Sequence, residues 1–148
     1  MMEKKAEKKI VIGKEEWGAL PELGLPAIKM RVDSGAKTSA LHAINIRPFK
    51  KDGQDWVSYE VHPIQRDAKT TIHCESPVID KRKVKSSSGL GEVRYVIKTI
   101  LSIAESTWPI EITLTNRDSM GYRMLLGRQA MSGKMLVDPE SSFQLGEV

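Results

Sequence analysis

Short segments in which apolar and polar residues alternate run through most of this chain. Alternation places successive side chains on opposite faces, as in a half-buried β-strand. In the clearest segment, Ile28, Met30 and Val32 share one face. Because such segments recur regularly, the sequence predicts an all-β protein whose six or more strands close into a barrel. Strands are expected at 10–12, 27–32, 44–51, 57–61, 70–74, 78–85, 93–103, 108–115, 122–126 and 135–137.

Turn signals separate these segments. Asp52-Gly53 is a strong hairpin turn, and the glycine-containing run 86–91 predicts the flexible tip of a long hairpin. Pro21 and two glycines, Gly18 and Gly24, predict a turn-rich stretch with one helical turn at 15–25. Residues 129–132 predict a short helix near the C-terminal end. No internal repeat interrupts this pattern.

Length and composition are those of one globular domain. The 148 residues are 40% hydrophobic and 28% charged, with a net charge of +4. We expect a flexible charged tail at 1–9 and a single domain at 10–148. The basic excess favours acidic partners such as acidic peptides, RNA or anionic surfaces. The tail lacks the apolar run of a signal peptide, and no stretch is long enough to span a membrane.

Cys74 is the only cysteine. One cysteine allows neither an intrachain disulfide nor a cysteine-based zinc cluster within one chain. Together with the absence of a signal segment, this predicts a reducing, cytoplasmic setting.

Two separated motifs carry the strongest chemical signal. Asp33-Ser34-Gly35-Ala36 directly follows the strand predicted at 27–32, and Leu125-Leu126-Gly127-Arg128 comes about ninety residues later. Asp-Ser-Gly alone is ordinary turn chemistry, so Asp33 could simply cap a tight turn. The late apolar-apolar-Gly-Arg element favours a catalytic interpretation instead.

Together, in this order, the two motifs resemble the signature of the retroviral-type aspartic proteases, the retropepsins. The resemblance implies the acid-protease barrel with one short C-terminal helix. It also implies that Asp33 is catalytic. Supporting roles follow for the active-site loop, Ser34, Gly35 and Ala36, and for the residues packed beneath it, Leu126, Gly127 and Arg128.

The same resemblance assigns the long hairpin to the flap that closes over bound peptide. Its tip would contact substrate through Ser87, Ser88 and Gly89. Residues 43–74 are extra relative to the retroviral enzymes, which indicates an inserted hairpin and strand.

The chain is still more similar to a bacterial family that carries the name ATP-dependent zinc protease and is RimK-associated and RimB-like. The similarity covers nearly the whole chain and rests on the segments 20–23, 32–42, 87–89 and 124–128. It implies a functional link to an ATP-grasp ligase that adds glutamates to a ribosomal protein, and the trimming of such tails by some members. The Gly-x-x-x-x-Gly-Lys-Ser/Thr loop that cradles ATP phosphates does not occur in the sequence.

An aspartic protease needs two carboxylates about 3 Å apart that share one proton. Asp33 is the one aspartate with Ser-Gly after it. The second carboxylate must therefore be Asp33 of another copy, which predicts a homodimer.

Position 37 departs from the retroviral pattern. Those enzymes carry an acid four residues after the catalytic aspartate, where it pairs with the arginine of the Gly-Arg element; here Lys37 and Arg128 cannot form that pair. Lys37, Arg31 and the basic run 81–85 beside the flap instead predict an acidic, glutamate-rich peptide or protein tail as substrate.

Other functional classes remain open at this stage. A basic barrel could bind RNA or the ribosome, or bind peptide without catalysis, although aromatic residues are only 5% of the chain and do not cluster. A zinc metallopeptidase is less favoured, because His42, His62 and His73 do not form a His-Glu-x-x-His motif. We predict neither a metal ion nor a cofactor, and expect His42 to be a buried structural residue.

Overall fold

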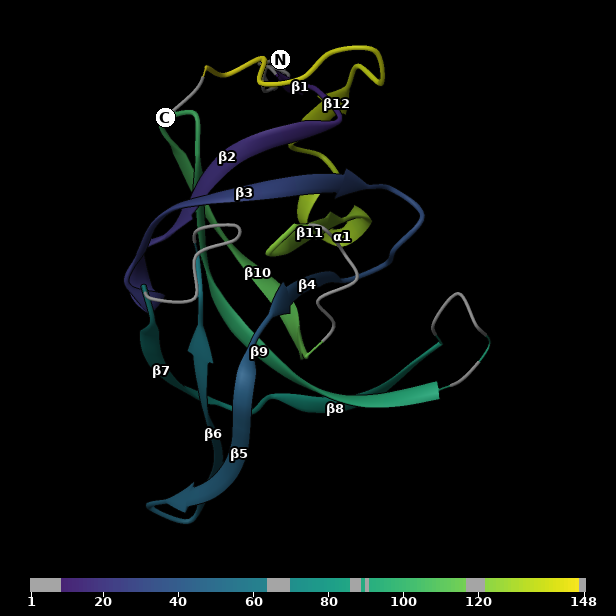
Figure 1. The fold of residues 1–148 in the computed structure, drawn as a ribbon. Coiled ribbons are helices and arrows are strands. Elements are labelled where there is room, and N and C mark those ends of the chain that lie inside the picture. The colour runs from purple at the N-terminus through teal and green to yellow at the C-terminus, as the bar shows by residue number, and fades with distance from the viewer. Residues whose placement is uncertain (1–8, 64–69, 86–88, 90, 117–121, 147–148) are drawn as a thin grey trace, which may run out of the picture.

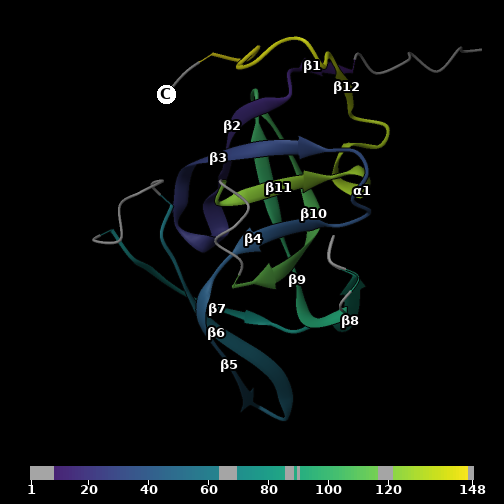
Figure 2. The ribbon, with the colours of Figure 1, turned by 45° about the vertical axis from the view of Figure 1, so that its right-hand side comes forward.

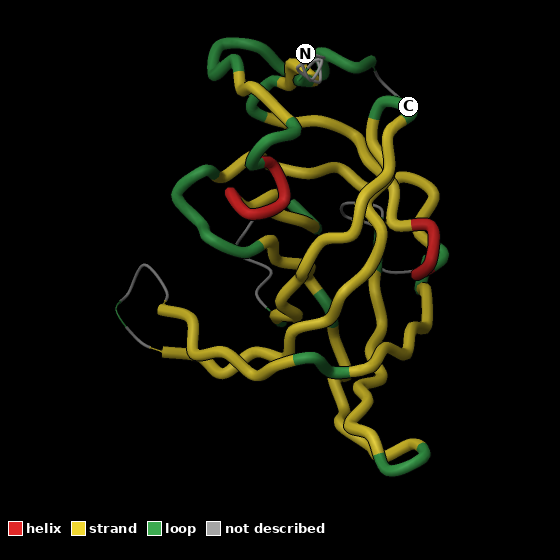
Figure 3. Tube along the Cα trace, turned by 180° about the vertical axis from the view of Figure 1, so that it is seen from behind, coloured by secondary structure: helices red, strands yellow, loops and turns green. Residues whose placement is uncertain are grey.

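The computed structural model describes residues 9–63, 70–85, 89, 91–116 and 122–146. The elements in chain order are β1 (Ile10–Ile12), β2 (Glu15–Leu20), the 3-10 helix η1 (Pro21–Leu23), β3 (Leu25–Asp33), β4 (Ser39–His42), β5 (Ile44–Lys51), β6 (Gln54–Val61), β7 (Ile72–Pro77), β8 (Asp80–Lys85), β9 (Gly91–Ile103), β10 (Ser106–Thr115), β11 (Met124–Gly127), α1 (Arg128–Met131) and β12 (Met135–Val137). Strand dominates these residues, and the short helical elements η1 and α1 are red in Figure 3.

Six strands form a closed ring in the order β10-β4-β11-β3-β2-β9, because β9 also pairs with β10 (Figure 1). The all-β prediction with a closed arrangement of at least six strands is confirmed. Strand β8 attaches to β9 outside the ring and forms with it the predicted long hairpin. Strands β1 and β12 make a separate parallel pair.

The predicted insertion is a separate three-stranded antiparallel sheet, β5-β6-β7. Val57, Tyr59 and Val61 alternate along β6 and are all buried, as the sequence pattern predicts. They join the same apolar cluster as the ring, so the insertion shares the core of the domain.

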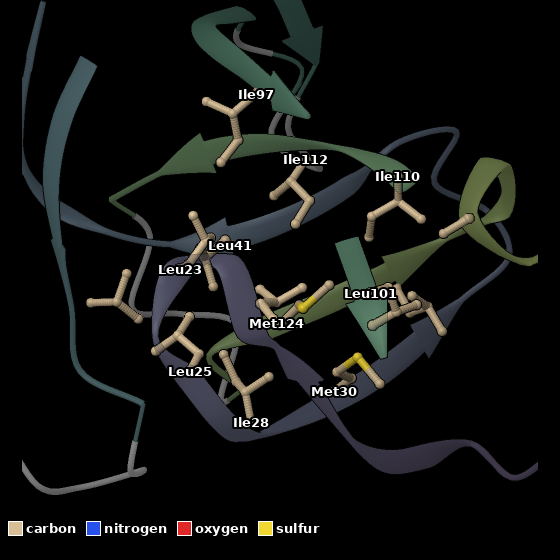
Figure 4. Packing of buried hydrophobic residues seen from close by; sticks show 14 of the residues in the cluster. Leu23, Leu25, Ile28, Met30, Leu41, Ile97, Leu101, Ile110, Ile112 and Met124 are labelled. Carbon is tan, nitrogen blue, oxygen red and sulfur yellow. The ribbon is translucent and has the colours of Figure 1, made fainter. Parts of the chain in front are cut away.

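The core fills the inside of the ring. Figure 4 shows side chains from β3, β4, β9, β10 and β11 pointing toward one another, among them Met30, Leu41, Leu101, Ile112 and Met124. These five residues are fully buried. Burial at alternating positions is the physical reason that these segments form strands of one closed sheet.

Two strands were not predicted, and both carry polar residues inward. Strand β2 pairs antiparallel with β3 where the sequence indicated a turn-rich stretch; only its end, at η1, is helical. Strand β4 lies buried between β10 and β11. Smaller differences affect β7, which begins at Ile72 rather than at residue 70, and α1, which begins at Arg128 rather than at 129.

Glu16 explains how β2 can bury a carboxylate. Its side chain is completely buried and accepts three backbone N–H groups, from Gly13 (2.7 Å), Gln144 (2.7 Å) and Leu145 (3.1 Å). A buried charge is tolerated when it is hydrogen-bonded in this way. Glu16 therefore fastens the C-terminal segment to the start of β2.

We expect Glu16→Ala to lower the free energy of unfolding by about 1–3 kcal/mol, because three backbone donors, one of them buried, lose their acceptor. Urea denaturation measures this loss. Glu22→Ala, which removes an exposed glutamate of η1, is the matched control and should unfold like the wild type. Equal midpoints for the two variants would contradict the role assigned to Glu16.

Candidate active site

Asp33 is the last residue of β3 and lies beside β11. The two strands run parallel, with Leu126 opposite Val32 and Gly127 opposite Asp33. The half-buried Asp33 thus lies at the carboxyl ends of two neighbouring ring strands, from which the chain turns toward β4. The pairing of β3 with β11 therefore fixes the position of the Asp33 backbone.

The loop after Asp33 is closed by the aspartate itself. The N–H of Gly35 donates to Asp33 Oδ1 at 3.1 Å, and the N–H of Ala36 donates to the Asp33 carbonyl at 3.2 Å. These are the bonds of an aspartate-initiated turn. They fix one carboxylate oxygen against the loop.

The first residues of α1 are hydrogen-bonded to the same loop. The N–H groups of Arg128 and Gln129 donate to the carbonyls of Ala36 (2.8 Å) and Lys37 (2.9 Å). The Arg128 side chain donates from Nη1 to the Ser34 carbonyl at 2.9 Å. Arg128 therefore stabilises the loop by donating to its backbone carbonyls. It does not pair with an acid at position 37, because that residue is Lys37 here.

Gly127 allows this close approach. A Cβ atom there would lie 2.5 Å from the Thr38 carbonyl carbon and 2.7 Å from the Ser39 nitrogen. The Gly127 N–H donates to the buried Ser39 hydroxyl at 2.9 Å. Only glycine leaves room for the loop and β11 to meet in this way.

A cavity of about 660 Å³ opens between the Asp33 loop and the β8–β9 hairpin. Figures 1 and 2 both show this hairpin on the side where the chain turns from β3 to β4. Among the described residues, one acid, Asp33, lines the cavity together with five cations: Lys37, Arg82, Lys83, Lys85 and Arg94. The volume suits a peptide side chain or a small ligand, and the charge suits an anion.

Arg82 joins the hairpin to the rest of the site. It donates from Nε to Asp80 (2.9 Å), pairs through Nη2 with Glu111 of β10 (2.7 Å), and donates from Nη1 to the Thr38 hydroxyl (3.4 Å). Bonds to the Asp80 and Glu111 carboxylates raise the pKa of Arg82 above its usual value. This arginine ties β8 to the end of the Asp33 loop.

Not every residue predicted for the site lines the cavity. Lys37 does, whereas Arg31 is exposed on β3 and is absent from the lining. Gly89 is exposed and adopts a positive φ of 83°, as a hairpin tip requires. Ser87 and Ser88 lie outside the described residues.

Sequence reasoning missed Arg94 and Thr38 as lining residues. A signal for Arg94 exists in the hairpin register, because Arg82 and Arg94 are both six residues from position 88. That symmetry places them opposite one another if the hairpin is regular, and the structure pairs them directly.

The histidines and Cys74 lie elsewhere. His42 is buried and His73 is exposed, while the neighbouring Cys74 is buried; burial raises the pKa of its thiol to about 11. Within the described ranges, no three His, Cys, Asp or Glu side chains are grouped so that they could hold a metal ion. A second cavity, of about 550 Å³, is lined by β5, β6 and β7 and shares no lining residue with the Asp33 cavity.

A strand-delivered Asp-Ser-Gly loop, supported by a Gly-Arg element inside a closed ring of strands and faced by a hairpin, defines the retropepsin-like class. The comparison with family models agrees, since residues 11–146 match the family described as "RimB-like: Retropepsin-like aspartic endopeptidase RimB". The chain belongs to this RimB-like family.

Curated relatives carry a different name. Proteins of Shewanella pealeana and Shewanella halifaxensis, each named "Probable alpha-L-glutamate ligase", are 61% identical over 142 residues, which is 96% of this chain. The matched region is 31% of each of those proteins, so this chain spans about a third of their length.

A solved structure shows the same fold. The crystal structure of protein Lpg0085 from Legionella pneumophila, of unknown function, superposes with a TM-score of 0.77 at 26% identity. The match covers 93% of this chain and 98% of that one. In the described part of this chain, no helix is long and apolar enough to cross a membrane.

Proposed function

We propose that this chain is the subunit of a homodimeric aspartic peptidase that hydrolyses peptide bonds in acidic, glutamate-rich peptides or protein tails. The observation that carries the proposal is Asp33, fixed at the carboxyl end of β3 and lining a cavity whose other charged residues, within the described part of the chain, are cations. Family membership supports the reaction class.

The chemistry requires two copies of Asp33. Two carboxylates that meet across a twofold axis share one proton, because both cannot be ionised at such short range. The ionised carboxylate takes a proton from the attacking water, and the protonated one donates to the scissile carbonyl oxygen. Each chain supplies one such carboxylate in the Asp-Ser-Gly context, so the site is complete only in the dimer.

The cations of the cavity support an acidic substrate. Lys37, Lys83 and Lys85 are exposed and can attract a run of carboxylates from a distance. The relatives named as glutamate ligases support a functional link to an enzyme that joins glutamates. A peptidase for the resulting acidic tail would hydrolyse, with water, the amide bonds that such a ligase forms.

We expect the preference for acidic peptides to weaken with salt. Exposed ion pairs contribute roughly 0–1 kcal/mol each and are screened once the Debye length falls to about 3 Å near 1 M salt. The test compares kcat/KM for a glutamate-rich peptide with that for its glutamine counterpart at low and high salt. Equal values for the two peptides at low salt would contradict the proposed substrate class.

A further inference from the structure

Two arginines face each other across the β8–β9 hairpin. Arg82 is paired directly with Arg94 in the antiparallel register, and both line the Asp33 cavity. Like charges directly opposite one another destabilise a sheet unless each has its own counter-ion. Here Arg82 forms ion pairs with Asp80 and Glu111, and Arg94 forms an ion pair with Glu92.

The two guanidinium groups are not equivalent. Arg82 uses all three of its nitrogens, on Asp80, Glu111 and Thr38. Within the described residues, Arg94 donates from Nε to Glu92 Oε2 at 2.9 Å, and no other acceptor for its side chain is seen there. Nη1 and Nη2, the terminal nitrogens of Arg94, are therefore available to a ligand in the cavity.

Arg94 is also shielded from water. Its side chain is 11% exposed, against 33% for Arg82. The same cavity is also lined by the buried Thr113 and Ala40 and the half-buried Leu125. A guanidinium in such surroundings binds a carboxylate more strongly than an exposed lysine does, because water competes less and the fork geometry allows two parallel bonds.

The lysines of β8 alternate with Arg82, and two of them, Lys83 and Lys85, also line the cavity. Side chains alternate along β8, so the stems of these lysines leave the strand on the face opposite Arg82, and Lys81 is not part of the cavity lining. Lys81 lies over the Tyr95 ring, 5.5 Å from its centroid, and a Cβ atom at Gly91 would meet Lys83 Cε. Lys83 and Lys85 can attract an acidic chain, but their geometry does not single out one carboxylate.

We propose that Arg94 is a specificity-determining residue that binds one carboxylate of the substrate inside the cavity, through Nη1 and Nη2. This inference rests on the proposed function and adds to it the group that distinguishes glutamate from glutamine. Arg82 has a different role, because its bonds to Thr38 and Glu111 hold the hairpin beside the Asp33 loop.

The experiment compares two peptides, one rich in glutamate and one in which every glutamate is glutamine, on four proteins. These are the wild type, Arg94→Gln, Arg94→Lys and the control Lys81→Gln, which removes the same charge from the outer face of the hairpin. We expect Arg94→Gln to lose at least about tenfold in kcat/KM on the glutamate peptide, in line with loss of a charged hydrogen-bonded pair. On the glutamine peptide it should change little.

Arg94→Lys should recover part of the preference, because a lysine retains the charge but not the fork. Lys81→Gln should leave the ratio of the two peptides close to that of the wild type. A thermal unfolding curve for each variant shows whether it is folded. If Arg94→Gln does not fold, Arg94→Lys carries the test through the same ratio of the two peptides.

Two outcomes would overturn the inference, and they differ. If the wild type cleaves the glutamate peptide and Arg94→Gln loses the same factor on both peptides, Arg94 does not determine specificity, although the proposed function stands. If the wild type cleaves neither peptide, the proposed function fails and the role of Arg94 fails with it.

Discussion

Asparagine at position 33 is expected to abolish peptide hydrolysis. Loss of a general base or acid lowers rates by about 10²–10⁴-fold, and a dimer of the variant loses both carboxylates at once. The fold should persist, because the amide oxygen can still accept the N–H of Gly35 that Asp33 Oδ1 now accepts. The measurement is kcat on a glutamate-rich peptide.

Circular dichroism and light scattering provide the control for this variant. Asp33→Asn should match the wild type in both secondary structure and oligomeric state. Asp52→Asn, which changes an exposed aspartate in the turn between β5 and β6, should retain full activity. Full activity in Asp33→Asn would exclude the aspartic mechanism.

The second large effect is expected at Gly127. Gly127→Ala would place Cβ 2.5 Å from the Thr38 carbonyl carbon, a contact that backbone atoms cannot relieve without moving. Such overpacking costs about 1–3 kcal/mol of unfolding free energy. The loop that carries Asp33 must shift as well. We therefore expect a large loss of peptide-cleavage activity even though most of the protein stays folded. Urea denaturation and peptide cleavage measure the two effects.

Gly35→Ala is the matched control for the stability effect. Gly35 does not have a positive φ, and its added Cβ would meet only Asp33 Oδ1, at 3.3 Å. We expect its unfolding free energy to stay within about 0.5 kcal/mol of the wild type, as for ordinary exposed positions. If Gly127→Ala were as stable and active as the wild type, the close packing assigned to β11 and the loop would be wrong.

Sequence periodicity predicted the strands whose apolar residues alternate. Strand β6 illustrates this, since Val57, Tyr59 and Val61 are buried. Strands β2 and β4 were not predicted from the sequence, because their buried faces include the polar residues Glu16, Ser39 and His42. The partners of Glu16 include Gln144 and Leu145, which lie 128 and 129 residues away. No local pattern contains that information.

The candidate site was predictable to a similar extent. The two motifs indicated Asp33 and Arg128 together, and the structure joins them through the bond from Arg128 to the Ser34 carbonyl. The exposed Lys37 lines the cavity, and its role in substrate binding stays a prediction. Arg94 was missed because its role depends on the register of the β8–β9 hairpin and on burial, and neither is visible in composition.

A mixing experiment tests the central claim, that the active site forms from two Asp33 residues in two chains. Wild-type protein is held at constant concentration while an equal amount of inactive Asp33→Asn is added and subunits are allowed to exchange. Random pairing leaves half of the wild-type chains in mixed dimers, so we predict that activity falls to about one half. Activity that stays unchanged after exchange has been verified would contradict the claim, because each chain would then act alone.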